Sequence, residues 1–136
     1  RRGLVVSIRE NGTFKTGSAD VSDAMRALIG EVGAALRGID NFVRVEGHTD
    51  DVPIHTARFA SNWELSTARA TAVVAFLVQE YGLPSDRLSA AGYAEFHPRV
   101  SNTTDESRAR NRRVDIVILN QTTADAEEPA RPGAAR

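Results

Sequence analysis

The stretch VEGHTDDVPIHTARFASNWELSTARA, residues 45–70, decides how this chain folds. It begins within an alternating apolar segment that is typical of a strand, continues as a polar loop, and ends in a sequence with helical periodicity. Ser61 and Glu64 stand three residues apart at the start of that helix, which is the spacing of a capping box. The stretch therefore predicts a strand, a loop and a helix in direct succession, with charged residues concentrated in the loop.

Further strands and one more long helix are predicted on either side of this unit. The order β-α-β-α-β-(turn)-β predicts an α+β fold, a two-layer sandwich in which two long helices cover one face of a mixed sheet. The first three strands are joined by parallel crossovers, and the last strand follows too closely for one, so it should run antiparallel. The predicted strands are 3–10, 42–48, 87–95 and 112–119; the long helices run from about 18 to 36 and from about 61 to 81, and a short helical turn falls within 105–112.

Length and composition predict one globular domain with a short tail. The chain has 136 residues, of which 41% are apolar and 26% charged. Residues 1–120 form the predicted domain, whereas residues 121–136, rich in Ala and Pro, are predicted to be a disordered C-terminal tail. The chain starts without an initiator Met, which suggests a fragment of a longer protein. Its longest apolar run, 72–78, is far shorter than the roughly 20 residues of a membrane-spanning helix.

Several function classes are excluded or disfavoured by what the sequence lacks. The absence of cysteine excludes disulfides, cysteine-ligated zinc and thiol catalysis. A net charge of -1 provides no field that would attract nucleic acid. The chain contains no G-x-S-x-G elbow, no phosphate-binding loop and no dinucleotide-binding motif. We therefore expect neither an enzyme nor a cofactor.

Arg69 raises the main electrostatic question in this sequence. It lies on or beside the apolar stripe of the second helix, and a buried guanidinium group needs a carboxylate partner because it cannot lose its proton. The preceding loop offers Asp50 and Asp51. Two interpretations remain. In the structural one, Arg69 forms a salt bridge with one of these aspartates or extends to solvent. In the functional one, Arg69 and an aspartate form a partly open pair that grips a ligand carrying both charges.

A metal site is the alternative interpretation of the same loop. His48, Asp50, Asp51 and His55 offer ligands that zinc or manganese accepts. Their spacing matches no compact metal-binding motif, and a single histidine at a strand end is more often a hydrogen-bonded structural residue. A pair formed by His48 and Asp50 could exchange protons with a substrate, but nothing beside it resembles a nucleophile.

A cluster of arginines comes immediately before the last predicted strand. A run of this kind is usually a solvated face, and it can also bind phosphate. If the last strand lies centrally in the sheet, one or two of these side chains should point towards the same end as the Asp50 loop. The cluster consists of Arg108, Arg110, Arg112 and Arg113.

Five segments together carry a family resemblance: VEGHTDDVPI (45–54), SNWELSTARA (61–70), LSAAGYAEFHP (88–98), Asn102 and RARNRRVDIVIL (108–119). In this order they resemble the OmpA-like peptidoglycan-binding domain. The lengthened HTDDVPI loop is most similar to the version in MotB, the flagellar stator subunit. The resemblance covers residues 4–119, which is nearly the whole predicted domain.

The resemblance implies a ligand and the residues that hold it. Family members bind peptidoglycan non-covalently through the meso-diaminopimelate of its stem peptide, whose free end is a zwitterion. Asp50 matches the aspartate that accepts hydrogen bonds from the ammonium, and Arg69 matches the arginine that holds the carboxylate through two parallel N–H bonds. The other positions implied to line or shape this pocket are Thr49, Asn62, Leu65, Arg113, Arg110 and Phe14.

The same resemblance implies a periplasmic domain that anchors a membrane complex to the cell wall. The intact protein would carry an inner-membrane helix upstream, form a homodimer and join a stator channel subunit. No nucleic acid is expected as a partner. Three alternatives remain: another OmpA- or Pal-type envelope anchor, a metal-assisted peptidoglycan amidase, and a dimerisation module in which Asp50 and Arg69 pair permanently.

Overall fold

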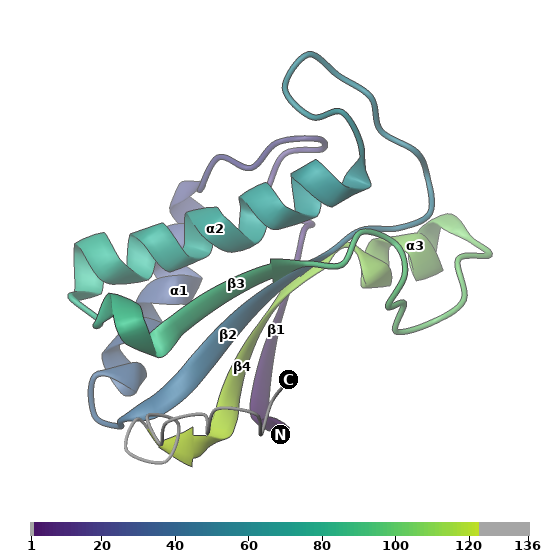
Figure 1. Cartoon of the computed structure of the whole chain (residues 1–136). Coiled ribbons are helices and arrows are strands. Elements are labelled where there is room, and N and C mark those ends of the chain that lie inside the picture. The colour runs from purple at the N-terminus through teal and green to yellow at the C-terminus, as the bar shows by residue number, and fades with distance from the viewer. Residues whose placement is uncertain (1, 123–136) are drawn as a thin grey trace, which may run out of the picture.

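The computed structural model describes residues 2–122, which form a four-stranded mixed sheet with two long helices on one of its faces (Figure 1). The α+β fold expected from the sequence is confirmed. Among the described residues, no helix has both the length and the apolar character needed to cross a bilayer. The elements are β1 (Arg2–Arg9), α1 (Asp23–Leu36), β2 (Asn41–His48), α2 (Asn62–Tyr81), the 3-10 turn η1 (Ser85–Arg87), β3 (Leu88–Gly92), α3 (Asp105–Asn111) and β4 (Arg113–Thr122).

The sheet has the strand order β1-β4-β2-β3. β4 runs antiparallel to both of its neighbours, and β2 runs parallel to β3. The last strand, β4, therefore lies inside the sheet. This is the arrangement in which the arginines just before β4 are expected to point towards the Asp50 loop, at the end of the sheet where β2 stops. β4 ends at Thr122, two residues beyond the predicted domain boundary. The rest of the predicted tail, 123–136, lies outside the described residues.

The two long helices differ in how well the sequence predicts where they start. The Ser61 hydroxyl accepts a hydrogen bond from the Trp63 N–H and donates one to the Glu64 carboxylate, and Gly82 ends α2 with a φ of 65°. In contrast, α1 begins at Asp23 and not near residue 18. Ser22 is its N-cap, with its hydroxyl 3.1 Å from the Met25 nitrogen.

Helix α2 lies unusually close to the sheet. A Cβ atom placed on Gly47 of β2 would stand 2.0 Å from the Ser66 carbonyl oxygen, and one on Gly92 of β3 would stand 2.2 Å from the Thr67 hydroxyl. Only glycine permits this approach, because any side chain would overlap the helix. The close packing fixes the first half of α2, and with it Arg69, beside the ends of the strands.

Candidate functional site

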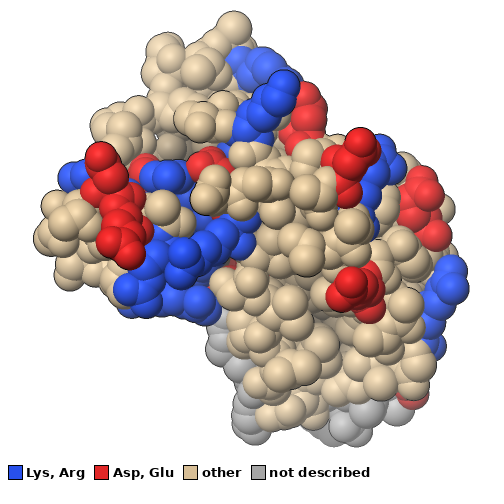
Figure 2. Space-filling model, turned by 180° about the vertical axis from the view of Figure 1, so that it is seen from behind, with Lys and Arg blue, Asp and Glu red and all other residues tan. Residues whose placement is uncertain are grey.

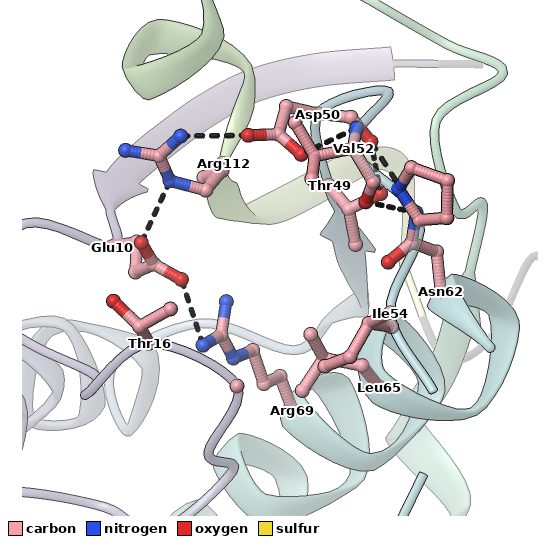
Figure 3. Close-up of a pocket in the computed structure, with 12 residues that line it drawn as sticks. Glu10, Thr16, Thr49, Asp50, Val52, Ile54, Asn62, Leu65, Arg69 and Arg112 are labelled. Carbon is pink, nitrogen blue, oxygen red and sulfur yellow. Dashed lines mark hydrogen bonds and ion pairs between the residues drawn. The ribbon is translucent and has the colours of Figure 1, made fainter. Parts of the chain in front are cut away.

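A pocket of about 380 Å³ opens at the end of the sheet where β2 stops and β4 begins (Figure 3). This is within the range of small-molecule binding sites. Three chain segments that are far apart in sequence build its walls: the loop after β1, the loop between β2 and α2, and the first turns of α2. The lining residues are Glu10, Thr16, Gly17, Thr49, Asp50, Val52, Pro53, Ile54, Asn62, Leu65, Arg69 and Arg112.

Four charged side chains of this pocket form one alternating row. Arg69 Nη2 lies 2.8 Å from Glu10 Oε2, Arg112 Nε lies 2.7 Å from Glu10 Oε1, and Arg112 Nη1 lies 2.7 Å from Asp50 Oδ2 (Figure 3). The prediction of a direct salt bridge between Arg69 and Asp50 or Asp51 is therefore wrong. Glu10 is the carboxylate that pairs with Arg69, and Arg112 is the guanidinium that pairs with Asp50. Two positive and two negative charges leave the row neutral.

The guanidinium of Arg69 is held in one orientation. Its Nε donates to the Ser18 carbonyl at 2.7 Å, and its Nη2 donates to the Lys15 carbonyl at 3.0 Å as well as to Glu10. The Phe14 ring packs against it, with 4.7 Å between the Arg69 Cζ atom and the ring centroid. Burial lowers the pKa of Arg69, and the Glu10 charge opposes that shift. Nη1 is left without a partner among the described residues, and it points into the pocket (Figure 3).

Arg112, and not Arg113, occupies the place beside Asp50. Its side chain is 30% exposed, so it lies at the mouth of the pocket. Burial acts to lower the pKa of Arg112, but hydrogen bonds with Asp50 and Glu10 outweigh it and raise that pKa. Arg113 is buried against Asp115, at 3.1 Å, and Arg110 is exposed on α3; neither lines the pocket. The expectation that they line it is corrected accordingly.

The loop that carries Asp50 is fixed by its own hydrogen bonds. Val52 N–H donates to Asp50 Oδ1 at 3.0 Å, and the Thr49 hydroxyl donates to the Asp50 carbonyl at 2.8 Å. Asn62 Nδ2, from the first turn of α2, donates to the Val52 carbonyl at 3.1 Å. Leu65 adds an apolar wall one helical turn later. The structure thus brings Thr49, Asp50, Asn62, Leu65 and Arg69 together around one space, which is the arrangement that the family resemblance implies.

The four residues of the alternative metal site do not converge. Asp51 lies outside the pocket and pairs with Arg108 at 3.2 Å. His55 is exposed, and its Nδ1 lies 3.0 Å from the Ala60 carbonyl. His48 is on the face of the sheet that the long helices leave uncovered, because it follows Gly47, whose Cα faces α2. These four residues are therefore too far apart to ligate one metal ion together.

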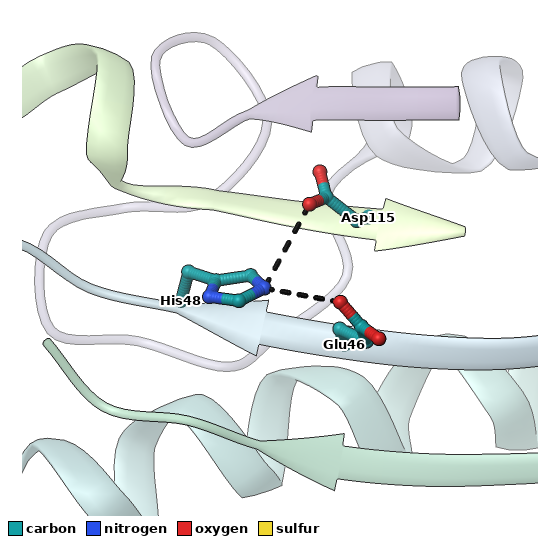
Figure 4. A group of neighbouring side chains, drawn as sticks. All are labelled: Glu46, His48 and Asp115. Carbon is teal, nitrogen blue, oxygen red and sulfur yellow. Dashed lines mark hydrogen bonds and ion pairs between the residues drawn. The ribbon is translucent and has the colours of Figure 1, made fainter. Parts of the chain in front are cut away.

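His48 belongs instead to a buried polar cluster on that second face (Figure 4). Its Nε2 lies 3.3 Å from Glu46 Oε1 and 3.7 Å from Asp115 Oδ2, and one ligand atom from each residue lies within 4.8 Å of the others. Three such side chains can in principle hold a cation. However, Arg44 already pairs with Glu46 at 2.8 Å and Arg113 with Asp115, so a metal ion would have to compete with two guanidinium groups. We interpret the cluster as an internal ion network.

Glu10 escapes prediction from local patterns, and Arg112 is predicted only as one of the four arginines before the last strand, but strand alternation carries a signal for both. Glu10 follows Ile8, and Arg112 precedes Val114, each by two positions, so each continues the row of core-facing side chains past the strand. Ile8 is opposite Val114 in the register, and Glu10 N–H donates to the Arg112 carbonyl at 2.9 Å. Extending the alternation beyond the apolar run would have found them.

The surface charges around α3 are mixed. Figure 2 shows the molecule from behind, with Lys and Arg side chains gathered at the end where α3 lies and acidic side chains among them. Arg108 and Arg110 lie in the last turn of α3, and Asp105 and Glu106 in its first. This arrangement complements the helix dipole.

Comparison with known proteins adds family evidence to this geometry. Residues 13–112 match the OmpA family. Motility protein B of Bacillus subtilis is 36% identical over 129 residues, covering 93% of this chain and 49% of its own length. The chain thus spans about half or less of the length of the curated relatives it matches.

Two solved structures have closely similar folds. The cell wall anchor of the type VI secretion system (T6SS) from Pseudomonas aeruginosa superposes with a TM-score of 0.80 at 40% identity, over 86% of this chain and 81% of that one. The periplasmic domain of Helicobacter pylori MotB superposes with a TM-score of 0.79 at 27% identity, over 92% and 86%.

Proposed function

This chain belongs to the OmpA family, and from that premise we propose that it is a non-enzymatic domain that binds peptidoglycan and anchors its protein to the cell wall. The similarity to a cell wall anchor supports this function, and the similarity to the periplasmic domain of MotB supports a periplasmic location. The ligand we propose is the meso-diaminopimelate of the stem peptide, bound in the pocket between Asp50 and Arg69.

The observation that carries this proposal is the neutral row of charges with an unused donor, Arg69 Nη1, that faces the pocket. Arg69 Nη1 faces the pocket, and a ligand carboxylate placed there would gain a charge-assisted hydrogen bond from a group that is already fixed. Asp50 uses two of the roughly four acceptor positions of its carboxylate and can accept more from an ammonium group. A zwitterion brings one charge of each sign, so the bound site stays neutral, whereas a singly charged ligand would bury an unbalanced charge.

We further propose that the whole protein serves as a flagellar stator subunit, as a homodimer with a channel partner. The similarity to Motility protein B supports this assignment, and the similarity to the T6SS anchor supports another anchoring machine. Upstream sequence separates the two: a single membrane helix bearing an aspartate is expected for a stator. A membrane segment without an acidic residue would contradict the stator assignment and leave the wall-binding function standing.

Co-sedimentation with purified diaminopimelate-containing sacculi tests the binding function. We expect the wild-type chain to pellet and Asp50→Asn and Arg69→Lys to lose about 10- to 100-fold in affinity, because each weakens a charged hydrogen bond worth roughly 1.5–3 kcal/mol. Arg110→Ala is the matched control, since Arg110 is exposed on α3 and does not line the pocket. Circular dichroism should first show that all variants are folded.

Two further measurements define the ligand. Free meso-diaminopimelate should release the bound domain, whereas cadaverine, which has the same terminal amines but no carboxylate, should not. The supernatant should contain no soluble wall fragments, as expected of a binder without hydrolytic activity. Wild-type protein that stays in the supernatant would refute wall anchoring, and release by both compounds would refute zwitterion recognition.

A further inference from the structure

Two aromatic side chains next to the pocket remain exposed. Trp63, in the first turn of α2, is 50% exposed, and Phe96, in the loop after β3, is 59% exposed. Their rings stack on one another, with centroids 5.3 Å apart and an angle of 26° between the planes. Each ring thus covers part of the other and presents its remaining surface to solvent. The two rings form one contiguous exposed aromatic surface, which makes them a candidate for contact with a ligand.

The Trp63–Phe96 pair is continuous with the pocket. Both rings line a second, smaller hollow of about 130 Å³. Three residues, Pro53, Ile54 and Asn62, line this hollow and the larger pocket alike. A ligand that fills the pocket would therefore continue directly onto the aromatic pair. The two hollows form one extended surface, charged at one end and aromatic at the other.

The chemistry of the second hollow suits a sugar ring. A pyranose presents C–H groups on its faces and hydroxyl or amide groups around its edge, so it needs an aromatic surface with a polar rim. Ser61, Asn62 and Glu95 supply that rim beside the two rings. This combination of apolar walls with a few polar groups that fix orientation is what small-ligand sites require.

We propose that the Trp63–Phe96 pair binds a sugar of the peptidoglycan strand, while the pocket holds the stem peptide. This inference rests on the proposed function, because the stem peptide fixes where the sugar lies. Diaminopimelate is the third residue of the stem, and three extended residues span about 10 Å. The sugar that carries the stem is therefore within reach of the surface next to the pocket, and the aromatic pair lines the neighbouring hollow that shares three residues with it.

Trp63 is the single tryptophan of the chain, so its fluorescence reports on this surface without labelling. We would titrate the wild-type domain with a disaccharide tetrapeptide and, separately, with the same tetrapeptide lacking sugars. The sugar-bearing ligand should shift Trp63 emission to shorter wavelength, and the sugar-free peptide should bind with little change in emission. Equal shifts with both ligands would overturn the sugar assignment.

Calorimetry on variants completes the test. Trp63→Ala and Phe96→Ala should each weaken binding of the disaccharide tetrapeptide by about fivefold and leave the affinity for the sugar-free peptide unchanged. Leu28→Ala is the matched control, because Leu28 is an exposed apolar residue on α1 that lines neither hollow.

The possible outcomes separate this inference from the proposed function. If neither ligand binds the wild type, the proposed function fails. If both bind but the aromatic variants behave as the wild type, only the sugar contact is refuted. Equal losses for both ligands would also refute it, since the pair would then contact or support the peptide. A change in oligomeric state caused by Trp63→Ala would assign the pair to contact with a second copy instead.

Discussion

Glu10 is the residue that joins the two arginines of the pocket. It comes from the end of β1, yet its carboxylate is shared between a guanidinium on α2 and one at the start of β4. The Glu10 side chain is 8% exposed and that of Arg69 2%, so the ion pair between them is shielded from water. Removing the central charge would leave two like charges close together, and Arg69 would keep only carbonyl partners.

We therefore predict that Glu10→Gln lowers the free energy of unfolding by about 3 kcal/mol, in the range for breaking a buried ion pair. Urea denaturation followed by circular dichroism measures this change. Combining it with Arg112→Gln should cost less than the sum of the two single losses, because the double variant removes one charge of each sign. Glu31→Gln, at an exposed position on α1, is the control and should have almost no effect. A loss no larger than this control's would contradict the shared role of Glu10.

His48 links stability to pH on the other face of the sheet. Burial lowers its pKa below 6.5, and the Arg113 charge acts in the same direction, against the raising effects of Asp115 and Glu46. The folded state therefore favours the neutral imidazole. Below the unfolded pKa the unfolded chain binds more protons than the folded one, so stability is complete above about pH 6.5 and falls as the pH drops towards the folded pKa.

We expect the free energy of unfolding of the wild type to decline on acidification below about pH 6.5. In His48→Gln this decline should be smaller. Denaturant titrations at a series of pH values would measure it. His55→Gln serves as the control, because His55 is exposed, and its slope should match that of the wild type. Identical slopes in both variants would show that His48 does not carry this dependence.

At the scale of elements, the contact between α2 and the sheet positions the site. The absence of side chains at Gly47 and Gly92 lets the helix approach the two parallel strands. Arg69 lies one turn after Ser66 and close to the strand ends, so any displacement of the helix would move its guanidinium relative to Glu10. The position of the charged row therefore depends on the packing of an uncharged pair of glycines.

Gly47→Ala tests this dependence. The new methyl group would meet a backbone carbonyl oxygen, which cannot rotate away as a side chain could, so we predict a loss of about 3 kcal/mol in stability. Gly38→Ala, whose Cβ would meet its nearest atom at 3.6 Å, is the control and should fold normally. Thermal melts of both variants suffice. A Gly47→Ala protein as stable as the control would show that the helix moves without cost.

Local signals explain which elements are predictable from the sequence. Helix α2 begins at a capping serine and ends at a left-handed glycine, and both are visible in the sequence. The start of α1 is not visible in the sequence. The Ser18 carbonyl accepts a hydrogen bond from Arg69, 51 residues away, and the helix begins only after Ser22, its N-cap. Local propensity contains no information about such a distant partner.

The same reasoning applies to the site. Asp50 and Arg69 come from one strand–loop–helix unit, so the sequence predicts that they lie near each other, whereas Asn62 is identified only through the family resemblance. The ion-pair partners of Asp50 and Arg69 are Glu10, directly after β1, and Arg112, directly before β4, and only the register of the complete sheet brings them to the pocket. The placement of Arg113 fails for a related reason, since a shift of one residue moves a side chain to the opposite face of the sheet.

At the scale of the whole molecule, the strand order sets where the fold is most stable. β4 is hydrogen-bonded to a strand on each side, whereas β1 and β3 are the edges. We predict that amides of residues 114–118 exchange with solvent most slowly, close to the rate set by global unfolding, and that those of β3 exchange faster. Hydrogen exchange followed by mass spectrometry or NMR measures this order. Slower exchange in β3 than in β4 would contradict it.

The central position of β4 has a consequence for how the protein is made. A ribosome delivers β1 and β2 long before residues 113–122, and the finished sheet pairs neither of those strands with the other. Until the last strand arrives, both keep an open edge on which another chain can add. The domain therefore cannot complete its sheet progressively during translation. It closes in a late step, when nearly all of the domain has left the ribosome.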